Sequence, residues 1–402
     1  MMRILGPVLF AHYLAAFTAL GMPLFMPRVL GVLAPGAPTW LVGTLYVLPT
    51  VCTALTATAW GRWADRHGRR LSLLRAQAGL AVGFLIAGFA PNLPVFVAAL
   101  VIQGTFGGSL AAANAYLATQ SKTGALSRAL DWTQYSARLA MVTAPILLGL
   151  ATRTGLTHEL YGYLAVLPCL ALLVTSRLPR DVPRVVASTK AASSTSPVPA
   201  TTPMHHAGDV SPTSILAGLL AIQFLFCFAM VVTFPYFLPY SEHLGVRDDG
   251  VAGWFYSLPH LVYLVAMPWL RRMGTSPLTL LAGLAVLALA CVGHAVLTVD
   301  TWLPVMRLAY GAGMLLSFVG LNRAMAAQSH ERGAGTLFGR FDATGKWAGA
   351  LGGVVAGSLV ARYGLAMPFV AAAITAGVAC LLAVAVYLPA TRRNVHVPPR
   401  HA

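Results

Sequence analysis

Four basic residues lie inside long apolar stretches of this sequence: Arg138, Arg307, Arg323 and Lys346. A charge at membrane depth is costly, so each of them is a functional candidate by default. A guanidinium can bind a carboxylate through two parallel hydrogen bonds, which supply both charge and orientation. Arg138 is the most specific candidate for such a contact, because its nearest local acid, Asp131, lies two helical turns before it.

The other three basic residues have simpler interpretations beside the functional one. Lys346 is placed to pair with Asp342 one helical turn before it. Arg307 and Arg323 lie close enough to the ends of their stretches to extend their side chains to the membrane surface.

A second cluster of candidates lies between two apolar stretches and reads Gly61-Arg-Trp-Ala-Asp65-Arg66-His-Gly68-Arg69-Arg70. Its glycines would allow a tight turn and a close approach of helices. Asp65 is a single acid in a basic patch, and its carboxylate can face the positive N-terminal end of another helix. The alternative is that the arginines only fix the orientation of the chain in a membrane.

The patterns that would indicate an enzyme, a cofactor or a metal site are missing from the sequence. It has no His-Glu-x-x-His, no Gly-x-Ser-x-Gly and no phosphate-binding loop, which argues against hydrolysis and against ATP as the energy source. The five cysteines lie in apolar stretches without a Cys-x-x-Cys pair, so no disulfide framework or zinc site is expected. A membrane-embedded enzyme, a channel and a receptor are therefore secondary alternatives.

The composition indicates the elements that hold these residues. Of the 402 residues, 57% are hydrophobic and 9% are charged, whereas an average soluble domain is about 25% charged. A helix that spans a membrane needs about 20 apolar residues. Twelve such segments are predicted: 7–30, 40–60, 72–90, 93–118, 131–151, 160–176, 213–239, 251–270, 279–299, 302–327, 341–361 and 365–388. The first apolar run is too long for a cleavable signal peptide.

The distribution of basic residues predicts the orientation of the chain. The sequence has 27 Lys and Arg against 11 Asp and Glu, a formal net charge of +16. With a cytoplasmic N-terminus, nineteen of the basic residues fall in the termini and even-numbered loops, and four in the opposite loops. This bias places both termini in the cytoplasm. Membrane topology and the lipid bilayer then account for the charge, and nucleic acid is not expected as a partner.

The two halves of the chain repeat one unit of six segments. Pro23-Leu-Phe-Met-Pro recurs as Pro235-Tyr-Phe-Leu-Pro, and Gly43-x-x-Tyr-x-Leu-Pro recurs as Gly253-x-x-Tyr-x-Leu-Pro. Six segments return the chain to its starting side, so the halves are parallel repeats about an axis along the membrane normal. The predicted domains are an N-terminal six-helix bundle (1–176), a flexible cytoplasmic linker rich in Ser, Thr and Pro (177–212) and a C-terminal bundle with a short cytoplasmic tail (213–402).

The cluster around Asp65 resembles the loop signature Gly-x-Leu-Ala-Asp-Arg-x-Gly-Arg-Arg of the major facilitator superfamily, with Trp63 in place of the leucine. With the twelve segments, the linker and the repeat, the resemblance covers the whole chain. It implies an all-α integral membrane fold, with twelve transmembrane helices in two six-helix bundles related by a pseudo-twofold axis. It also implies that Asp65 faces the start of the eleventh segment and latches the bundles together on the cytoplasmic side. Gly61, Arg66, Gly68, Arg69 and Arg70 would complete this gate.

The resemblance also implies which segments line a substrate pathway: the first, fourth, seventh and tenth, with the fifth and eleventh beside them. The polar candidates on these and neighbouring segments are His12, Gln103, Asn114, Gln134, Arg138, Gln223, His260, Arg307, Asn322 and Lys346. Because the lining segments have no deep acid, we expect a net positive pathway that favours an anionic substrate. The candidates for carrying a coupling proton are Asp131, Asp342 and His12.

The expected function is that of a secondary active transporter, monomeric and without a cofactor, in a bacterial cytoplasmic (inner) membrane. The fifth segment partly matches an antiporter motif through Pro145 and Gly149, which favours proton-coupled export of a small organic molecule such as a siderophore or a drug. In the fourth segment, Leu100 stands where many proton-coupled members have an arginine before Gln103-Gly104, which weakens the assignment of proton coupling. Uptake of a small organic anion by symport is the alternative.

Overall fold

The structure is a computed structural model that describes residues 2–120, 123–181, 212–273, 277–328 and 334–393. The elements of the first half are α1 (Met2–Gly21), η1 (Met22–Phe25), α2 (Met26–Leu33), α3 (Trp40–His67), α4 (Arg69–Gly88), α5 (Leu93–Phe106), α6 (Ser109–Gln120), α7 (Thr123–Ala151), η2 (Thr152–Thr154), α8 (Leu160–Leu164) and α9 (Val166–Ser176). Those of the second half are α10 (Pro212–Val231), α11 (Phe237–His243), α12 (Asp249–Met273), α13 (Pro277–Val296), η3 (Asp300–Trp302), α14 (Leu303–Gln328), α15 (Ala334–Tyr363) and α16 (Met367–Arg393).

The described helices confirm the membrane fold class. Ten helical stretches in the described residues are long and apolar enough to cross a membrane. A shorter apolar stretch, Leu160–Ser176, and the 30-residue α15 supply the other two predicted segments. α15 is not among the ten, because it is rich in glycine and alanine and carries charged residues in its first half.

Several helix boundaries differ from the sequence-based expectation: α7 begins at Thr123 and not at residue 131, and α15 begins at Ala334 and not at residue 341. α3 continues through Gly61 to His67, so most of the predicted turn around Asp65 is helical. The chain turns only at Gly68, whose φ of +98° is strained for any residue with a side chain. The fourth segment is interrupted between α5 and α6, where Gly108 has a φ of +83°.

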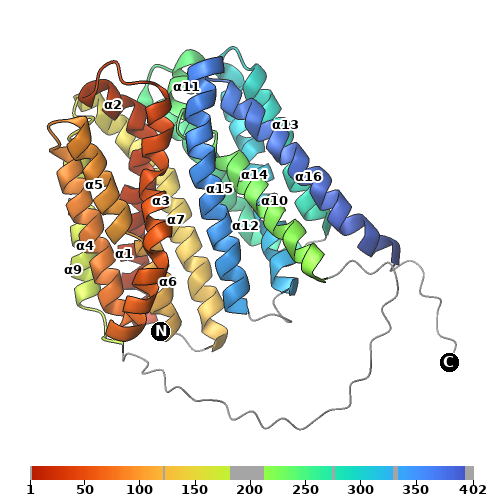
Figure 1. Ribbon diagram of the computed structural model, residues 1–402, viewed down its shortest axis with the longest axis horizontal. Coiled ribbons are helices and arrows are strands. Elements are labelled where there is room, and N and C mark those ends of the chain that lie inside the picture. The colour runs from red at the N-terminus through yellow and green to blue at the C-terminus, as the bar shows by residue number, and fades with distance from the viewer. Residues whose placement is uncertain (1, 121–122, 182–211, 274–276, 329–333, 394–402) are drawn as a thin grey trace, which may run out of the picture.

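Figure 1 shows the helices of the first half, red to yellow, beside those of the second half, green to blue. Within the first half, α1 packs on α7 and α9, and α4 packs on α5. Within the second half, α13 packs on α14 and α16, and α10 packs on α15 and α16. The largest contacts between the halves are α7 with α12 and α3 with α15. These four helices therefore form the seams along which the halves meet.

The same repeat position provides the close approach at both seams. A side chain on Gly43 of α3 would collide with the carbonyl of Gly353 in α15. A side chain on Gly253 of α12 would collide with the carbonyl of Pro145 in α7. Because glycine has no Cβ, the paired helices can touch through their backbones at these points.

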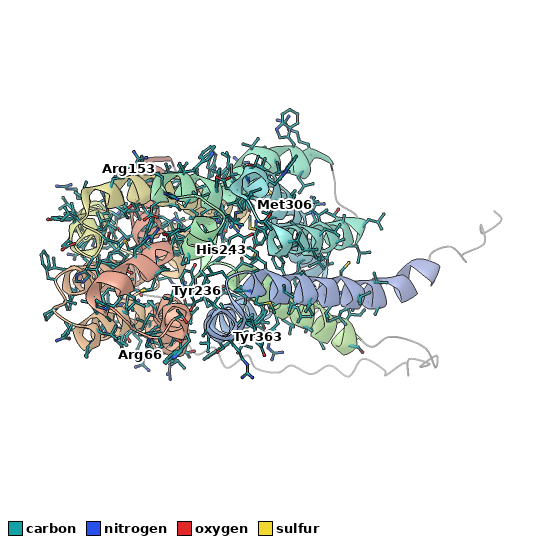
Figure 2. The ribbon with its side chains drawn as sticks, turned by 90° about the horizontal axis from the view of Figure 1, so that it is seen from above. Arg66, Arg153, Tyr236, His243, Met306 and Tyr363 are labelled. Atoms are coloured by element: carbon teal, nitrogen blue, oxygen red, sulfur yellow. The ribbon has the colours of Figure 1, made fainter. Side chains whose placement is uncertain are left out.

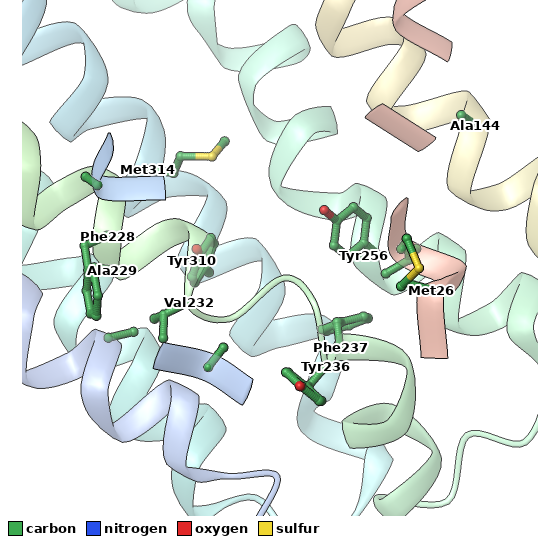
Figure 3. Packing of buried hydrophobic residues seen from close by; sticks show 14 of the residues in the cluster. Met26, Ala144, Phe228, Ala229, Val232, Tyr236, Phe237, Tyr256, Tyr310 and Met314 are labelled. Atoms are coloured by element: carbon green, nitrogen blue, oxygen red, sulfur yellow. The ribbon is translucent and has the colours of Figure 1, made fainter. Parts of the chain in front are cut away.

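The apolar core continues from one half into the other. Figure 3 shows Met26 and Ala144 of the first half near Tyr256 and Phe237 of the second half. All four belong to one cluster of buried residues. The buried surface between the halves at this level is therefore apolar, and polar contacts lie on either side of it along the seams.

Candidate functional site

α7 and α12 run antiparallel along the seam that holds the Arg138 side chain. Three pairs mark their register: Gly253 lies against the Pro145 carbonyl, the Ser257 hydroxyl donates to the Val142 carbonyl at 2.9 Å, and the ring centroids of Tyr263 and Tyr135 lie 6.4 Å apart. Arg138 and His260 occupy the step between the last two pairs. The periodicity of two packed helices therefore brings together two residues that are 122 positions apart in the sequence.

Arg138 contacts the other half through one hydrogen bond and two aromatic rings. Its Nη1 lies 3.0 Å from Nδ1 of His260, and its guanidinium lies 4.7 Å from the ring centre of Tyr263 and 5.8 Å from that of Phe318. Because arginine only donates, Nδ1 must accept, which requires a neutral His260 with its proton on Nε2. The described partners of Arg138 are thus a neutral ring and two aromatic faces.

Arg307 does not extend to the membrane surface, which was one interpretation of the sequence. Its side chain is 1% exposed. Nε donates to the Phe255 carbonyl at 3.1 Å and Nη2 donates to the Tyr256 carbonyl at 3.0 Å, both in α12. Its guanidinium lies 4.5 Å from the ring centre of Phe237. The residue is therefore part of the packed interior of the second half.

His12 of α1 contacts α7 near the position of Arg138. It is buried, and its Nδ1 lies 3.1 Å from the Ser136 hydroxyl, two residues before Arg138. Gln103 and Gln223 are also buried, whereas Gln134 is exposed.

The other polar candidates have local environments. Asn114 is half-buried, and Asn322 donates to the Phe318 carbonyl within its own helix. Lys346 forms a 2.7 Å ion pair with Asp342 one turn before it, as the simpler interpretation of the sequence expects. Asp131 is half-buried and lies inside α7, about two turns after the helix begins at Thr123.

The loop between α3 and α4 is organised by an acid that sequence reasoning missed. Asp65, at the end of α3, is exposed and forms a 2.8 Å ion pair with Arg69 at the start of α4. Asp181, after α9, accepts hydrogen bonds from the backbone N–H groups of Arg69 at 2.5 Å and Arg70 at 3.0 Å. Asp181 therefore caps the start of α4.

The side chain of Arg70 binds the same end of the first half. It donates to the carbonyls of Thr175 and Ser176 at the end of α9. The signal for this arrangement in the sequence was the first acid after the sixth segment, in a stretch assigned to the linker.

A set of ion pairs joins the halves at the far end, the end of the molecule that holds α2 and α11 (Figure 1). Arg28 of α2 contacts Glu242 at 3.0 Å and Asp249 at 3.0 Å. Arg153 contacts Asp248 at 2.8 Å. The Val251 N–H and Arg153 both stabilise the charged form of Asp248, which lowers the pKa of this carboxyl below its ordinary value. The pair is therefore fully formed at neutral pH and is lost as the pH falls through that lowered pKa.

Tyr236 adds a hydrogen-bonded contact to the far end. Its hydroxyl donates to the Thr39 carbonyl at 2.5 Å and accepts from the Gly43 N–H at 3.1 Å. Figure 2, viewed onto this end, places Tyr236 near the middle of the molecule, between the two halves. The sequence singled out neither this tyrosine nor the far-end acids. The adjacent Asp248-Asp249 pair was the available signal, because few acids occur in the chain.

Comparison with known proteins identifies what this chain resembles. Residues 5–270 match the Major Facilitator Superfamily. The Multidrug resistance protein MdtG of Serratia proteamaculans (strain 568) is 34% identical over 119 residues, which cover 28% of this chain and 29% of that protein. MdtG of Erwinia billingiae (strain Eb661) is 32% identical over 111 residues, which cover 28% of this chain and 27% of that protein. The alignments thus span less than a third of the length of these relatives.

Solved structures resemble the chain along almost its whole length. The POT family transporter PepTSo has a TM-score of 0.72 and 13% sequence identity, covering 98% of this chain and 99% of that chain. A peptide transporter POT in complex with sulfate has a TM-score of 0.76 and 15% identity, covering 97% and 94%. The human organic anion transporter MFSD10 (TETRAN) has a TM-score of 0.64 and 17% identity, covering 95% and 99%. At these identities the likeness concerns the fold alone.

Proposed function

The chain belongs to the major facilitator superfamily of membrane transporters, and from that premise we propose that it exports a small organic molecule by alternating access. The observation that carries export is the identity of about a third with multidrug resistance proteins over part of their length. The family membership makes it a transporter and not an enzyme. Export, the substrate and the coupling ion are the proposed part.

The proposed substrate class is a small organic anion, such as a siderophore, or a drug that carries a carboxylate. The support for it is the environment of Arg138, whose described contacts are His260, Tyr263 and Phe318. With no acid among its described contacts, this guanidinium retains the charge that a carboxylate would neutralise. We propose that the carboxylate binds Arg138 when the seam between α7 and α12 opens.

The proposed cycle alternates between contacts at the far end and contacts at the opposite end. The ion pairs of Arg28 and Arg153 and the hydrogen bonds of Tyr236 all lie at the far end. If both termini are cytoplasmic, as the basic residues predict, this arrangement corresponds to an inward-facing state. The bundles 1–176 and 213–402 would then rock about the seams as rigid units, connected by the linker 177–212.

The proposed energy source is the proton gradient across a bacterial cytoplasmic membrane, with the protein acting as a monomer. Asp131, Asp342 and His12 are the proposed coupling groups, and the motif around Asp65 is the proposed cytoplasmic gate. His12 is notable because it hydrogen-bonds Ser136 on α7, the helix that carries Arg138. Protonation there would change a contact between α1 and α7.

The experiment that tests export is a flux assay in proteoliposomes with the cytoplasmic face of the protein outward. Salicylate is a suitable organic anion, and an acidic lumen supplies the gradient. We expect salicylate to accumulate in the lumen while protons leave it, and collapse of the gradient to stop accumulation. Accumulation that persists without a proton gradient would remove protons as the driving ion. Salicylate movement in the same direction as the protons would favour the alternative, an uptake symporter for organic anions.

A further inference from the structure

The Pro259 position in α12 leaves one backbone carbonyl of that helix without its usual partner. In an α-helix the carbonyl of residue i accepts from the N–H of residue i+4, and proline has no N–H. Phe255 is the residue that loses its partner to Pro259. Arg307 of α14 donates Nε to this carbonyl at 3.1 Å and Nη2 to the next one, Tyr256, at 3.0 Å. The guanidinium therefore replaces the missing hydrogen bond.

Binding these two carbonyls removes the Arg307 guanidinium from water, which costs free energy. It is 1% exposed, and its charge lies against the ring centres of Phe237 at 4.5 Å and Tyr310 at 5.0 Å. Figure 3 shows Phe237 near Tyr256, and the ring centroids of these two residues lie 5.5 Å apart. Its Nη1 has no hydrogen-bond partner among the described residues. Burying a charge without an acidic partner costs free energy. A buried arginine at this position therefore needs an explanation.

The first half of the chain shows whether the helix crossing at this position requires a charged residue. A side chain on Gly104 would collide with Pro49 and Cys52, and one on Gly311 would collide with Pro259 and Val262. The two prolines are repeat equivalents, 210 residues apart, so the same proline–glycine crossing of helices forms in both halves.

The residue four positions before each glycine differs between the halves. It is Leu100 in the first half and Arg307 in the second, and both are buried to 1% exposure. The crossing in the first half forms with an apolar side chain at this position. The charge in the second half is therefore not needed to build the crossing.

What differs in the second half is the residue that follows the proline. His260 lies directly after Pro259, and its Nδ1 accepts the hydrogen bond from Arg138 of the other half. We propose that Arg307 is a positioning residue for the anion contact at Arg138. It fixes the carbonyls of Phe255 and Tyr256, and with them the part of α12 around Pro259 that presents His260 to Arg138. This inference rests on the proposed anionic substrate and extends it to the residue that sets its selectivity.

The test compares an acid with its amide on the purified full-length protein. Salicylate and salicylamide have the same shape and differ in the carboxylate, so the ratio of their dissociation constants reports the anion contact alone. The variant Arg307→Leu reproduces the residue found in the first half. We expect it to lower the preference for salicylate about tenfold, the scale of one charge-assisted hydrogen bond.

Two further variants distinguish positioning from a general loss of structure. His260→Asn should lower the same preference, and the double variant with Arg307→Leu should lower it no further, because both act on one contact. Leu315→Ala removes a buried side chain from the same helix and should weaken binding of the acid and the amide equally. Arg307→Lys keeps the charge but loses the planar fork, so its preference should fall between those of the wild type and the leucine variant.

Three outcomes would overturn the inference. The first is an unchanged preference in Arg307→Leu, or in Arg307→Lys if the leucine variant does not fold. The second is an equal loss for acid and amide, as in Leu315→Ala, and the third is additive losses in the double variant. A wild-type protein without preference for salicylate would instead overturn the proposed anionic substrate, and the inference with it.

Discussion

At the scale of single residues, three of the cations that the sequence places at membrane depth differ in what they contact. Lys346 pairs with an acid of its own helix, and Arg307 binds backbone carbonyls within its own half. Arg138 alone of the three contacts a side chain of the other half through a hydrogen bond. If the halves move relative to each other in a transport cycle, a residue whose partner lies in the other half must lose or exchange that partner. This makes Arg138 the natural position for a substrate contact.

Replacing Arg138 should therefore affect charged and neutral ligands differently. We expect Arg138→Ala to weaken salicylate binding by about 1.5–3 kcal/mol, the scale of a hydrogen bond to a charged group, while binding of salicylamide changes little. Arg138→Lys keeps the charge without the fork and should have a smaller effect. Isothermal titration of both ligands measures the difference. Equal losses for the two ligands would mean that Arg138 is structural.

Asp65 should matter for transport and not for stability. Its side chain is exposed and its described ion pair is with Arg69 across the turn at Gly68, and an exposed ion pair contributes only about 0.2–1 kcal/mol to stability. We expect Asp65→Asn to keep normal abundance and a normal melting temperature but to impair salicylate flux. The reason is the proposed latch, in which the carboxylate faces the start of α15 when the opposite end closes. Wild-type flux at wild-type abundance would exclude Asp65 from the mechanism.

At the scale of elements, the start of α4 depends on an acid outside the loop that precedes it. Asp181 accepts from two backbone N–H groups of α4. We expect Asp181→Ala to destabilise the protein by about 1 kcal/mol, the typical value for a lost helix cap. Asp181→Asn keeps an accepting oxygen and should have a smaller effect. Thermal unfolding followed by size-exclusion chromatography measures both. An alanine variant as stable as the wild type would show that this cap contributes nothing.

The helices themselves could be predicted from the sequence, because a spanning helix must satisfy its own backbone and leave apolar side chains toward lipid. Their ends could not be predicted equally well. Hydropathy ends the second segment at Trp60, yet the residues up to His67 contain nothing that breaks a helix. The turn is fixed instead by the backbone of Gly68 and by Asp181, which is 112 residues from the amide that it caps.

The sequence indicated which residues belong to the candidate site around Arg138, but not which residues they contact. The cost of a buried charge singled out Arg138 and Arg307 from the sequence. Their partners depend on which helix faces which, and a single sequence does not contain that information. The carbonyl that Arg307 binds could have been anticipated, because Pro259 leaves Phe255 without its helical donor.

At the scale of the whole molecule, the described polar contacts between the halves are unevenly distributed. Ion pairs and tyrosine hydrogen bonds occur at the far end, whereas the described contacts of Asp65 and Asp181 at the opposite end stay within the first half. The far-end contacts must break if the halves rock about the seams. They therefore set part of the free-energy difference between the two states.

Breaking the far-end ion pairs should shift the molecule toward the state that is open at that end. Asp249 has a side chain that is 13% exposed and accepts two hydrogen bonds from Arg28. A hydrogen bond to a charged group contributes about 1.5–3 kcal/mol, so its loss should change the ratio of the two states by about tenfold or more. We expect Asp249→Asn and Arg28→Gln to have this effect.

Spin labels in a variant without native cysteines can measure the shift. A label pair at Val32 and Val299 reports the far end, and a pair at Arg62 and Arg340 reports the opposite end, because all four side chains are exposed. In both charge-removing variants the first distance should lengthen and the second should shorten. Arg247→Gln, at an exposed arginine of the same loop, should leave the wild-type distances unchanged. If the charge-removing variants kept both wild-type distances, the far-end ion pairs would not contribute to the free-energy difference between the two states.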